Sequence, residues 1–420
     1  MSLRTDVLVL GAGLSGLRAA WAAAESAPGL RVTLAALLPG PSGSSFANRN
    51  DSLGMQLPLG ERERTRFARE VVWLARPGMV DEILVRILAE EAELRFRELE
   101  TLGLKFRYQA DGRLFRRTGC FSPFARAAVF DDLAHAHSLF RDKILSLGVD
   151  LRTGLEVLGL ETANGRVTGA RLRPVGADQE KAPLTIRAGA VVMALGGPAP
   201  LHERHVAGPG NPGRSWQMLR EAGARMENTD YLQYMWMTLA GRRFCSPADI
   251  AGPDAVARTP DGGEVAPSAK VLALADARRT HCPAAWGPVE YEGDLVHDYG
   301  MDQWLQAQAD DQGVVRVKLG QGGWEEVALF AHAGNGGALI NEHGAVLAAK
   351  TEPGTEPESG VETGTKTDTE TTPLLPGLYA CGECATGMHG ANRLGGAMVT
   401  ATQVFGKRAG EAAARFARLS

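Results

Sequence analysis

The chain opens with an apolar run that a glycine-rich turn separates from an alanine-rich stretch. Residues 6–10 predict a fully buried parallel strand, residues 17–25 a helix, and residues 30–36 a second buried strand. This order is the start of a β-α-β unit and predicts an α/β fold. A secretory leader fits less well, because Asp6 interrupts its charged region and the glycines split its apolar region.

Helical spacing returns twice in the first half of the chain. Apolar residues among charges predict a helical region over 61–104 and a further helix over 135–147. Three strands of a meander follow at 149–160, 165–173 and 184–187, and a separate buried strand at 190–195. The last elements are a short strand at 378–381 and a helix over 399–419.

Two segments depart from this regular pattern. The region from about 234 to 327 is less periodic and contains four of the seven Trp, which indicates a smaller domain inserted into the first. The stretch 350–372 is rich in Thr, Glu, Pro and Gly. It can bury too little apolar surface to offset its ordering entropy, so a flexible polar loop is predicted there.

Composition excludes several classes of protein. The net charge of −4 gives no global electrostatic case for nucleic acid or an anionic membrane, and no apolar run is long enough for a direct membrane span. Five Cys in 420 residues are too few for a disulfide scaffold, so we expect a reduced, cytoplasmic environment. The 51 Gly indicate many tight turns or close backbone approaches.

The first glycine turn has the spacing of a nucleotide-binding motif. Gly11, Gly13 and Gly16 lie between a predicted buried strand and a predicted helix, which is the context that this motif needs. The glycines let the backbone approach a pyrophosphate at the helix N-terminus. Dinucleotide binding is therefore predicted, although the motif does not separate FAD from NAD. Residues 35–37 offer no acidic group for a ribose, so that contact must differ.

A second motif, close to the C-terminal end, is more specific. Residues 376–396 contain Gly-Glu followed by His-Gly-Ala-Asn-Arg-Leu-Gly-Gly. Together with the first turn, this string resembles the fumarate reductase/succinate dehydrogenase flavoprotein family, which includes L-aspartate oxidase. The resemblance implies a Rossmann-like FAD-binding domain with an inserted smaller α+β capping domain. It also implies hydride transfer between flavin N5 and a carboxylate-bearing substrate.

The resemblance assigns domains and cofactor contacts. It implies an FAD-binding domain of residues 1–232 and 328–420 and a capping or substrate domain of 233–327, and the chain would lack the family's C-terminal helical domain. FAD would be non-covalent, because the position of the family's tethering His is Gly43. The cofactor-binding residues implied are Gly11, Gly13, Gly16, Ser44, Ser45, Val157, Gly196, Gly197, Glu383, Ala397 and Met398.

The substrate-binding residues are only partly retained. His332 and Arg393 match the family's catalytic His and Arg, and a guanidinium suits a carboxylate. The family's second carboxylate-binding His and its proton-donating Arg are Met235 and Ala248 here, and its Thr is Met237. Fumarate and aspartate are therefore not the expected substrates. Residues 235–237 are either cap core or the lining of a less polar pocket.

The cap and the cysteines offer few replacements for the lost groups. Arg278, Arg279 and His281 could supply a cation, but a solvated basic loop is the favoured interpretation. Cys381 and Cys384 form a Cys-x-x-Cys without two more nearby ligands, so no metal site is predicted and small buried residues are favoured.

Two functions remain open. The first is an FAD-dependent oxidoreductase that acts on a small-molecule carboxylate. The second is a flavin-bearing electron-transfer subunit without the family's substrate chemistry. Either one could work with a separate iron–sulfur subunit, since the chain has no ferredoxin-like cysteine set.

Overall fold

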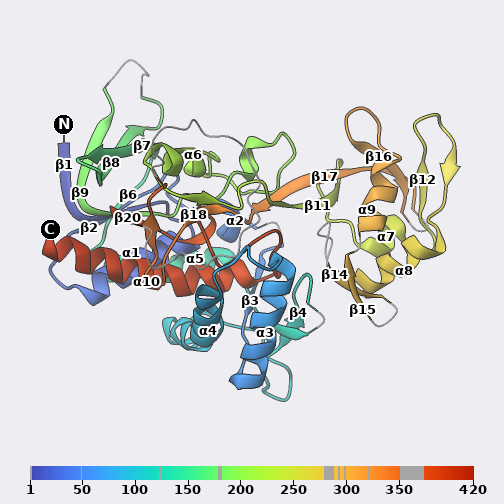
Figure 1. The fold of residues 1–420 in the computed structure, drawn as a ribbon, viewed down its shortest axis with the longest axis horizontal. Coiled ribbons are helices and arrows are strands. Elements are labelled where there is room, and N and C mark those ends of the chain that lie inside the picture. Colours follow the sequence, from blue (N-terminus) through green and yellow to red (C-terminus); the bar gives the residue numbers. More distant parts are fainter. Residues whose placement is uncertain are drawn as a thin grey trace.

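The computed structural model describes residues 2–48, 50–122, 124–177, 182–278, 288–291, 294–297, 299–319, 322–350 and 373–420. Two long strands, β11 (Leu232–Thr238) and β17 (Trp324–Gly334), pass from a larger part to a smaller one (Figure 1). The larger part holds both ends of the chain, and the smaller part lies at the right of Figure 1. The domain boundaries stay a prediction, since β17 runs across one of them.

A mostly parallel sheet forms the centre of the larger part. Its strands follow the order β19-β20-β9-β1-β2-β6, and β8 and β7 extend it from β9. The bounds are β1 (Ser2–Leu10), β2 (Val32–Ala35), β6 (Asp150–Arg152), β7 (Leu155–Ala163), β8 (Arg166–Pro174), β9 (Leu184–Met193), β19 (Ala345–Leu347) and β20 (Leu374–Ala380). Leu10 pairs with Ala35 and with Met193, so the carboxyl ends of the parallel strands meet at one edge. Ligands of open α/β sheets bind at this edge.

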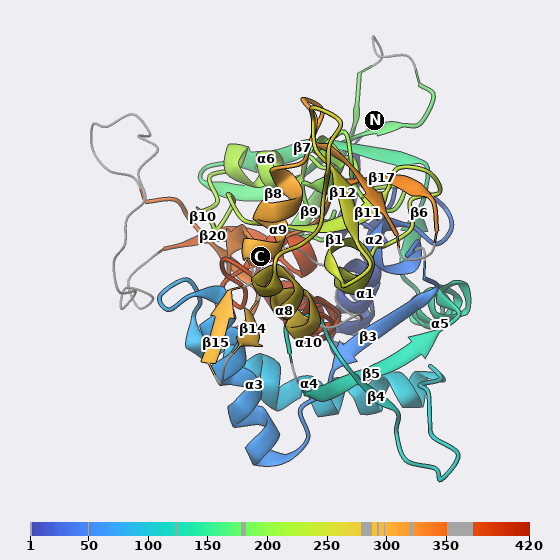
Figure 2. The ribbon, with the colours of Figure 1, turned by 90° about the vertical axis from the view of Figure 1, so that its right-hand side faces the viewer.

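Two of the helices that pack on the main sheet lie unusually close to each other. α1 (Leu14–Ser26) packs against α10 (Ala397–Leu419), and a Cβ at Gly410 would lie 2.2 Å from the carbonyl oxygen of Ala19. In both ribbon views a layer lies below these helices (Figures 1 and 2). It comprises α3 (Gly60–Ala75), α4 (Glu82–Leu102), β3 (Ser52–Gln56), β4 (Arg116–Thr118) and β5 (Ala125–Asp131). α5 (Leu133–Ser146) contacts α1.

The smaller part has its own sheet and core. Its strands follow the order β11-β17-β16-β12-β13, with β12 (Val256–Arg258), β13 (Glu264–Val265) and β16 (Val314–Lys318). Its other elements are α7 (Pro247–Ala251), α8 (Ala269–Arg278), α9 (Tyr299–Gln306), β14 (Pro288–Tyr291) and β15 (Asp294–His297). Trp236, Leu274 and Val315 belong to a buried cluster separate from the main core. This part therefore has a hydrophobic core of its own.

Short elements complete the larger part. They are α2 (Gly43–Phe46), α6 (Ser215–Glu221), β10 (Met226–Glu227), β18 (Gly337–Leu339), β21 (Ala385–Thr386), and the 3₁₀ turns η1 (Ala199–Leu201) and η2 (Gly382–Cys384). Among the described residues, no helix is long and apolar enough to cross a membrane. The predicted polar loop lies, from residue 351 to 372, outside the described residues.

Two predictions about elements were wrong in detail. The strands expected at 184–187 and 190–195 are one strand, β9, which pairs with β1 from Ser2 to Leu10. Within β9, a Cβ at Gly189 would lie 3.0 Å from the carbonyl oxygen of Asp6 on β1 and 3.2 Å from Ala417 Cβ on α10, so close neighbours on both elements favour glycine. The helical region 61–104 is two helices, with Pro77 and Gly78 between them and Asp81 capping the second.

Candidate functional site

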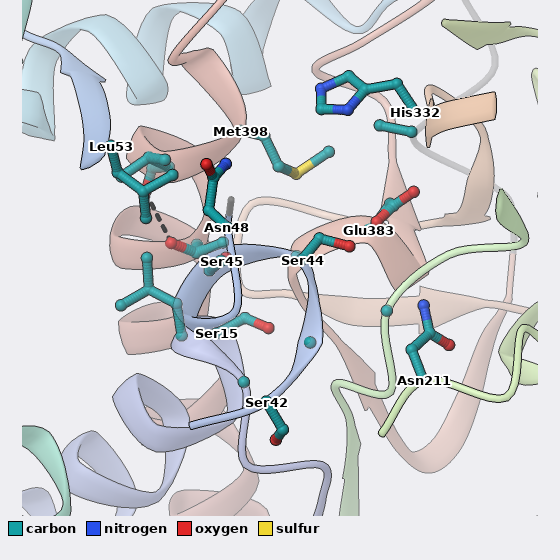
Figure 3. Close-up of a pocket in the computed structure, with 18 of the residues that line it drawn as sticks. Ser15, Ser42, Ser44, Ser45, Asn48, Leu53, Asn211, His332, Glu383 and Met398 are labelled. Atoms are coloured by element: carbon teal, nitrogen blue, oxygen red, sulfur yellow. Dashed lines mark hydrogen bonds between the residues drawn. The ribbon is translucent and has the colours of Figure 1, made fainter. Parts of the chain in front are cut away.

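A pocket with a volume of about 350 Å³ starts at the carboxyl edge of the main sheet and reaches the strands that join the two parts. Residues that directly follow β1, β2 and β9 line it at one end, and His332 on β17 and Met235 on β11 line it at the other. Figure 3 shows Ser42 towards one end and His332 at the other, with Ser44 and Glu383 between them. The pocket therefore combines a nucleotide-type edge with residues of the smaller part.

The three glycines of the first turn have different roles. A Cβ at Gly16 would lie 1.9 Å from the carbonyl oxygen of Gly11, and one at Gly11 would lie 2.4 Å from that of Ala194. Gly13 lines the pocket, no atom of the described residues lies within 4 Å of its missing Cβ, and it precedes α1 without a side-chain cap. Gly11 and Gly16 allow close packing, while Gly13 keeps space open at an uncapped helix N-terminus, where a phosphate would bind.

Glu383 lies at the middle of the pocket against a glycine. Its Oε1 accepts a hydrogen bond of 2.6 Å from the amide of Gly334, and a Cβ at Gly197 would lie 2.1 Å from the same oxygen. Burial raises the pKa of the Glu383 carboxyl, although the Gly334 amide and the charge of Arg393 oppose this shift. The site fits a ligand hydroxyl, since a buried carboxyl group can accept a hydrogen bond from one.

The other predicted cofactor residues divide into two groups. Ser44, Ser45, Val157, Gly196 and Met398 all line the pocket. Three further predicted residues do not line the pocket: Gly16, Gly197 and Ala397. Gly16 and Gly197 lie against Gly11 and Glu383, which do line it, and Ala397 is buried. The structure therefore brings most of the predicted cofactor-binding residues together on one cavity.

The first turn of α10 presents a second uncapped helix N-terminus to the pocket. Gly396 precedes the helix at φ +83°, no side chain caps it, and the first turn holds no acidic residue. Gly396, Met398 and Val399 line the pocket. The amide groups at this end of a 23-residue helix carry a partial positive charge towards the cavity.

Arg393 is a buried and fixed cation at the far end of the pocket. It is 6 % exposed, and its Nη2 donates a hydrogen bond of 2.8 Å to Oε1 of Gln233. Gln233 donates in turn to the carbonyl oxygen of Arg393 at 2.7 Å. Burial lowers the pKa of the Arg393 guanidinium, and its buried Nε has no hydrogen-bond partner within the described structure. The guanidinium is thus held through Nη2, and the described structure leaves one of its buried donors unsatisfied.

His332 occupies a β-bulge. Gln233 pairs with Ala333 and Tyr234 with Ala331, so His332 is the extra residue between them on β17. Bulges re-aim a side chain and are frequent next to active sites. Burial, with a smaller contribution from Arg393, lowers the pKa of His332 to about 3. The ring is therefore neutral at pH 7, and its buried Nδ1 has no partner within the described structure.

Residues 235–237, for which the sequence left two interpretations open, have separate environments. Met235 lines the pocket, Met237 is fully buried against Ala328 and Phe330, and Trp236 belongs to the core of the smaller part. Trp236 and Met237 are therefore core residues, whereas Met235 lies on the pocket wall, and its contact with a substrate stays a prediction.

Among the proposed replacements in the smaller part, the one that the structure describes, Arg278, does not line the pocket. Arg278 is 4 % exposed, and its Nη2 donates to Oδ2 of Asp302 at 2.5 Å, so the interpretation as a solvated loop is wrong for it. Arg279 and His281 lie outside the described residues. Ala248 is exposed on α7 and is not among the lining residues.

The cysteine pair behaves as small buried residues. Cys381 and Cys384 are both fully buried free thiols that do not line the pocket, and burial raises the pKa of Cys384 to about 12. Among the described residues, no three ligand-type side chains gather for a metal ion.

Sequence reasoning missed several lining residues. Gln233 was assigned no role, and Asn211, which donates to the carbonyl oxygen of Gly197 at 3.0 Å, gave no signal in the sequence. A whole wall at 117–121 was also missed. The one sequence signal in this wall was the glycine at 119. The structure explains it, because a Cβ there would lie 2.4 Å from the carbonyl oxygen of Gly395.

The cradle for a dinucleotide and the buried cation next to it define a dinucleotide-dependent oxidoreductase. The family model described as "FAD binding domain" matches residues 6–282 and 301–399. The chain belongs to this family and is an FAD-binding oxidoreductase of the succinate dehydrogenase/fumarate reductase type. The predictions of the family, the fold class and FAD are thereby confirmed.

Two relatives and one solved structure give the extent of the similarity. An L-aspartate oxidase of Halobacterium salinarum is 27% identical over 98% of this chain and 75% of its own length. The 8-methylmenaquinol:fumarate reductase flavoprotein subunit of Wolinella succinogenes is 25% identical over 98% of this chain and 65% of its own length. The E. coli quinol fumarate reductase FrdA has a TM-score of 0.70 at 20% identity, covering all of this chain and 71% of that one.

Proposed function

We propose that the chain transfers hydride between N5 of bound FAD and a small carboxylate-bearing substrate other than fumarate or aspartate. The observation that supports this most directly is Arg393, a buried cation held by Gln233 on the wall of the same pocket as the dinucleotide cradle. FAD would be held by the two uncapped helix N-termini and by Glu383, and it supplies the hydride-accepting group.

The residues of the chain bind and orient the substrate. Gln233 holds Nη2 of Arg393, and N–H groups of the guanidinium that the described structure leaves without a partner would bind a substrate carboxylate. Such charge-assisted hydrogen bonds are strong in a water-poor site, and they stabilise negative charge that develops next to the carboxylate. His332 adds a neutral ring that can donate or accept one hydrogen bond, because its pKa is about 3.

The exclusion of fumarate and aspartate rests on two positions. By resemblance, Met235 and Ala248 stand where the family has its second carboxylate-binding His and its proton-donating Arg. A thioether is only a weak acceptor, and an alanine transfers no proton. Losing one such group typically lowers turnover by about 10²–10³. We therefore expect marginal turnover of both dicarboxylates.

Anaerobic bleaching of the flavin absorbance tests this proposal. Succinate and L-aspartate should bleach it slowly, and a larger saturated monocarboxylic acid should bleach it faster. Arg393→Gln should abolish bleaching while FAD stays bound. Arg113→Gln is the matched control, because that arginine is an exposed partner of Asp111. Fumarate reduction by the wild type at about 10 s⁻¹ would contradict the proposal.

A flavin-bearing electron-transfer subunit is the second candidate. It is favoured by the same two replaced positions and by the relative named as a flavoprotein subunit. An iron–sulfur subunit would then be the partner. The two candidates differ in one result: an electron-transfer subunit would be reduced by dithionite and reoxidised by a ferredoxin-type protein, while no carboxylic acid would bleach it.

A further inference from the structure

A strained turn forms one wall of the pocket. The amide of Ser122 donates to the carbonyl oxygen of Gly119 at 3.2 Å, which closes a turn over residues 119–122. Within it, Phe121 has φ +65°. This left-handed region suits glycine, and a bulky residue there is an outlier, because its Cβ crowds the backbone. Backbone strain of this kind persists where the surrounding structure enforces it and is frequent at ligand sites.

Hydrogen bonds hold the turn in place from both sides. The amide of Gly395 donates to the carbonyl oxygen of Cys120 at 2.9 Å, and Gln56 donates to the carbonyl oxygen of Gly395 at 2.7 Å. At the other end, Ser122 donates to Oε2 of Glu70 at 2.9 Å. The hydroxyl of Ser122 also accepts a bond of 3.0 Å from Arg126, which is 1 % exposed and pairs with Glu70. The turn is therefore held in a fixed place, bonded to a residue two positions from Arg393.

The turn adds an apolar surface to the pocket that contains Arg393. Phe121 is 9 % exposed and lines this pocket together with Met235 and Phe244 from the smaller part. Met235 and Phe244 pack against one apolar cluster. The other arginine that lines the pocket, Arg117, is exposed. The described walls thus offer one buried cation and apolar side chains from both parts of the molecule.

We propose that Phe121 is a specificity-determining residue, and that the substrate is a monocarboxylic acid that carries an aryl or branched alkyl group on the far side of its reacting bond. The carboxylate binds at Arg393 and the apolar group binds against Phe121, Met235 and Phe244. This assignment rests on the proposed function, because it concerns the substrate of that same site. The strained backbone at residue 121 is maintained because it places an aromatic side chain where a relaxed turn would have glycine.

Binding of two acids to the FAD-loaded full-length chain tests this. trans-Cinnamate and fumarate are titrated separately while the flavin absorbance is followed, with acetate as a probe for carboxylate binding alone. We expect cinnamate to bind at least about tenfold more tightly than fumarate. Phe121→Ala should bring the two affinities close together and leave acetate binding unchanged. Phe124→Ala is the matched control, because Phe124 is an aromatic residue of the same segment that does not line the pocket.

A second variant tests the strain separately. Phe121→Gly removes the same ring but relaxes the backbone, so it should lose the cinnamate preference and yet melt at a higher temperature than Phe121→Ala. A lower melting temperature for the glycine variant overturns the strain argument, and a preference retained in Phe121→Ala overturns the role of Phe121.

The remaining outcomes separate this inference from the function on which it rests. If acetate and both larger acids bind but fumarate equals or exceeds cinnamate, the apolar substrate class is wrong and Arg117 becomes the second carboxylate contact. If none of the three acids perturbs the flavin, the proposed carboxylate site itself is overturned, and this inference with it.

Discussion

Among the glycines of the first turn, Gly16 is needed for close packing of the backbone and Gly13 for space at the proposed phosphate site. Gly16→Ala should lower the melting temperature of the FAD-free protein, because its Cβ would lie 1.9 Å from the carbonyl oxygen of Gly11. Gly13→Ala should leave that temperature nearly unchanged, since its added Cβ would have none of the described atoms within 4 Å and its φ of −70° suits alanine. It should nevertheless weaken FAD binding, because the added methyl group enters the phosphate space. Thermal melts and FAD titration of both variants check this; equal FAD affinity of Gly13→Ala and the wild type would remove Gly13 from the cradle.

His332 should make the stability of the protein depend on pH. Its pKa is lowered to about 3 in the folded state, so between about pH 3 and 6.5 the unfolded chain binds a proton that the folded chain does not. Stability from this group is therefore present above pH 6.5 and is lost as the pH falls. His332→Gln should reduce the slope of unfolding free energy against pH by up to about 1.4 kcal/mol per unit.

Urea denaturation between pH 4.5 and 6.5 checks the His332 slope. Glu383 acts in the opposite direction, because burial raises the pKa of its carboxyl, so the comparison is made between variants at each pH. His343→Gln controls for the loss of a histidine ring from the surface. Parallel pH profiles of His332→Gln and the wild type would contradict the prediction.

At the residue scale, the sequence identified residues that lie within a motif and missed the partners that the fold brings to them from distant parts of the chain. The position of Arg393 and Glu383 on the pocket was predictable because both lie within one specific string of residues, while their roles stay predictions. Their partners were not: Gln233 comes 160 positions before Arg393, and nothing local marks it as the group that holds the guanidinium. Arg278 was assigned to a solvated loop because its sequence neighbours are basic, whereas Asp302, 24 positions later, pairs with it in the core.

At the scale of elements, periodicity predicted the strands and helices but not their junctions. The bulge at His332 depends on the register between β11 and β17, and only the paired strands reveal it. Two strands were expected where β9 is one, and Gly189 lies between them at a place where β1 and α10 both come close. Contacts between elements that are distant in the chain thus determine strand ends and bulges, which the local hydrophobic pattern leaves ambiguous.

The buried pair between α8 and α9 should dominate the stability of the smaller part. Arg278→Met leaves the buried carboxylate of Asp302 without this partner, which typically costs about 3–5 kcal/mol. Adding Asp302→Leu should recover part of the loss, although the indole of Trp236 then loses its 2.8 Å hydrogen bond. Arg316→Met, which removes an exposed pair with Glu326, should cost less than about 1 kcal/mol. Urea denaturation followed by tryptophan fluorescence measures all three; equal losses for Arg278→Met and Arg316→Met would refute the ranking.

At the scale of the whole molecule, the pocket is assembled from segments that are far apart in the chain. Its lining comes from residues 11–54, 117–157, 194–244, 332–333 and 382–402. A cofactor in this pocket would be lined by the turn after β1, by α2 and α10, and by β11 and β17, which lead to the smaller part. Ligand binding to the folded state alone raises stability by an amount that grows with the free ligand concentration.

The attachment of FAD can therefore be tested through the stability of the whole chain. The resemblance places the family's tethering His at Gly43, which lines the pocket and has no side chain that could form such a bond. We predict non-covalent FAD, so acid precipitation should release yellow flavin to the supernatant. The melting temperature should also rise with added FAD, in step with a gain of about 2.7 kcal/mol when free FAD reaches 100 times its dissociation constant. A covalent flavin would stay on the precipitated chain and leave the melting temperature independent of added FAD, and either result would show that another residue forms the bond.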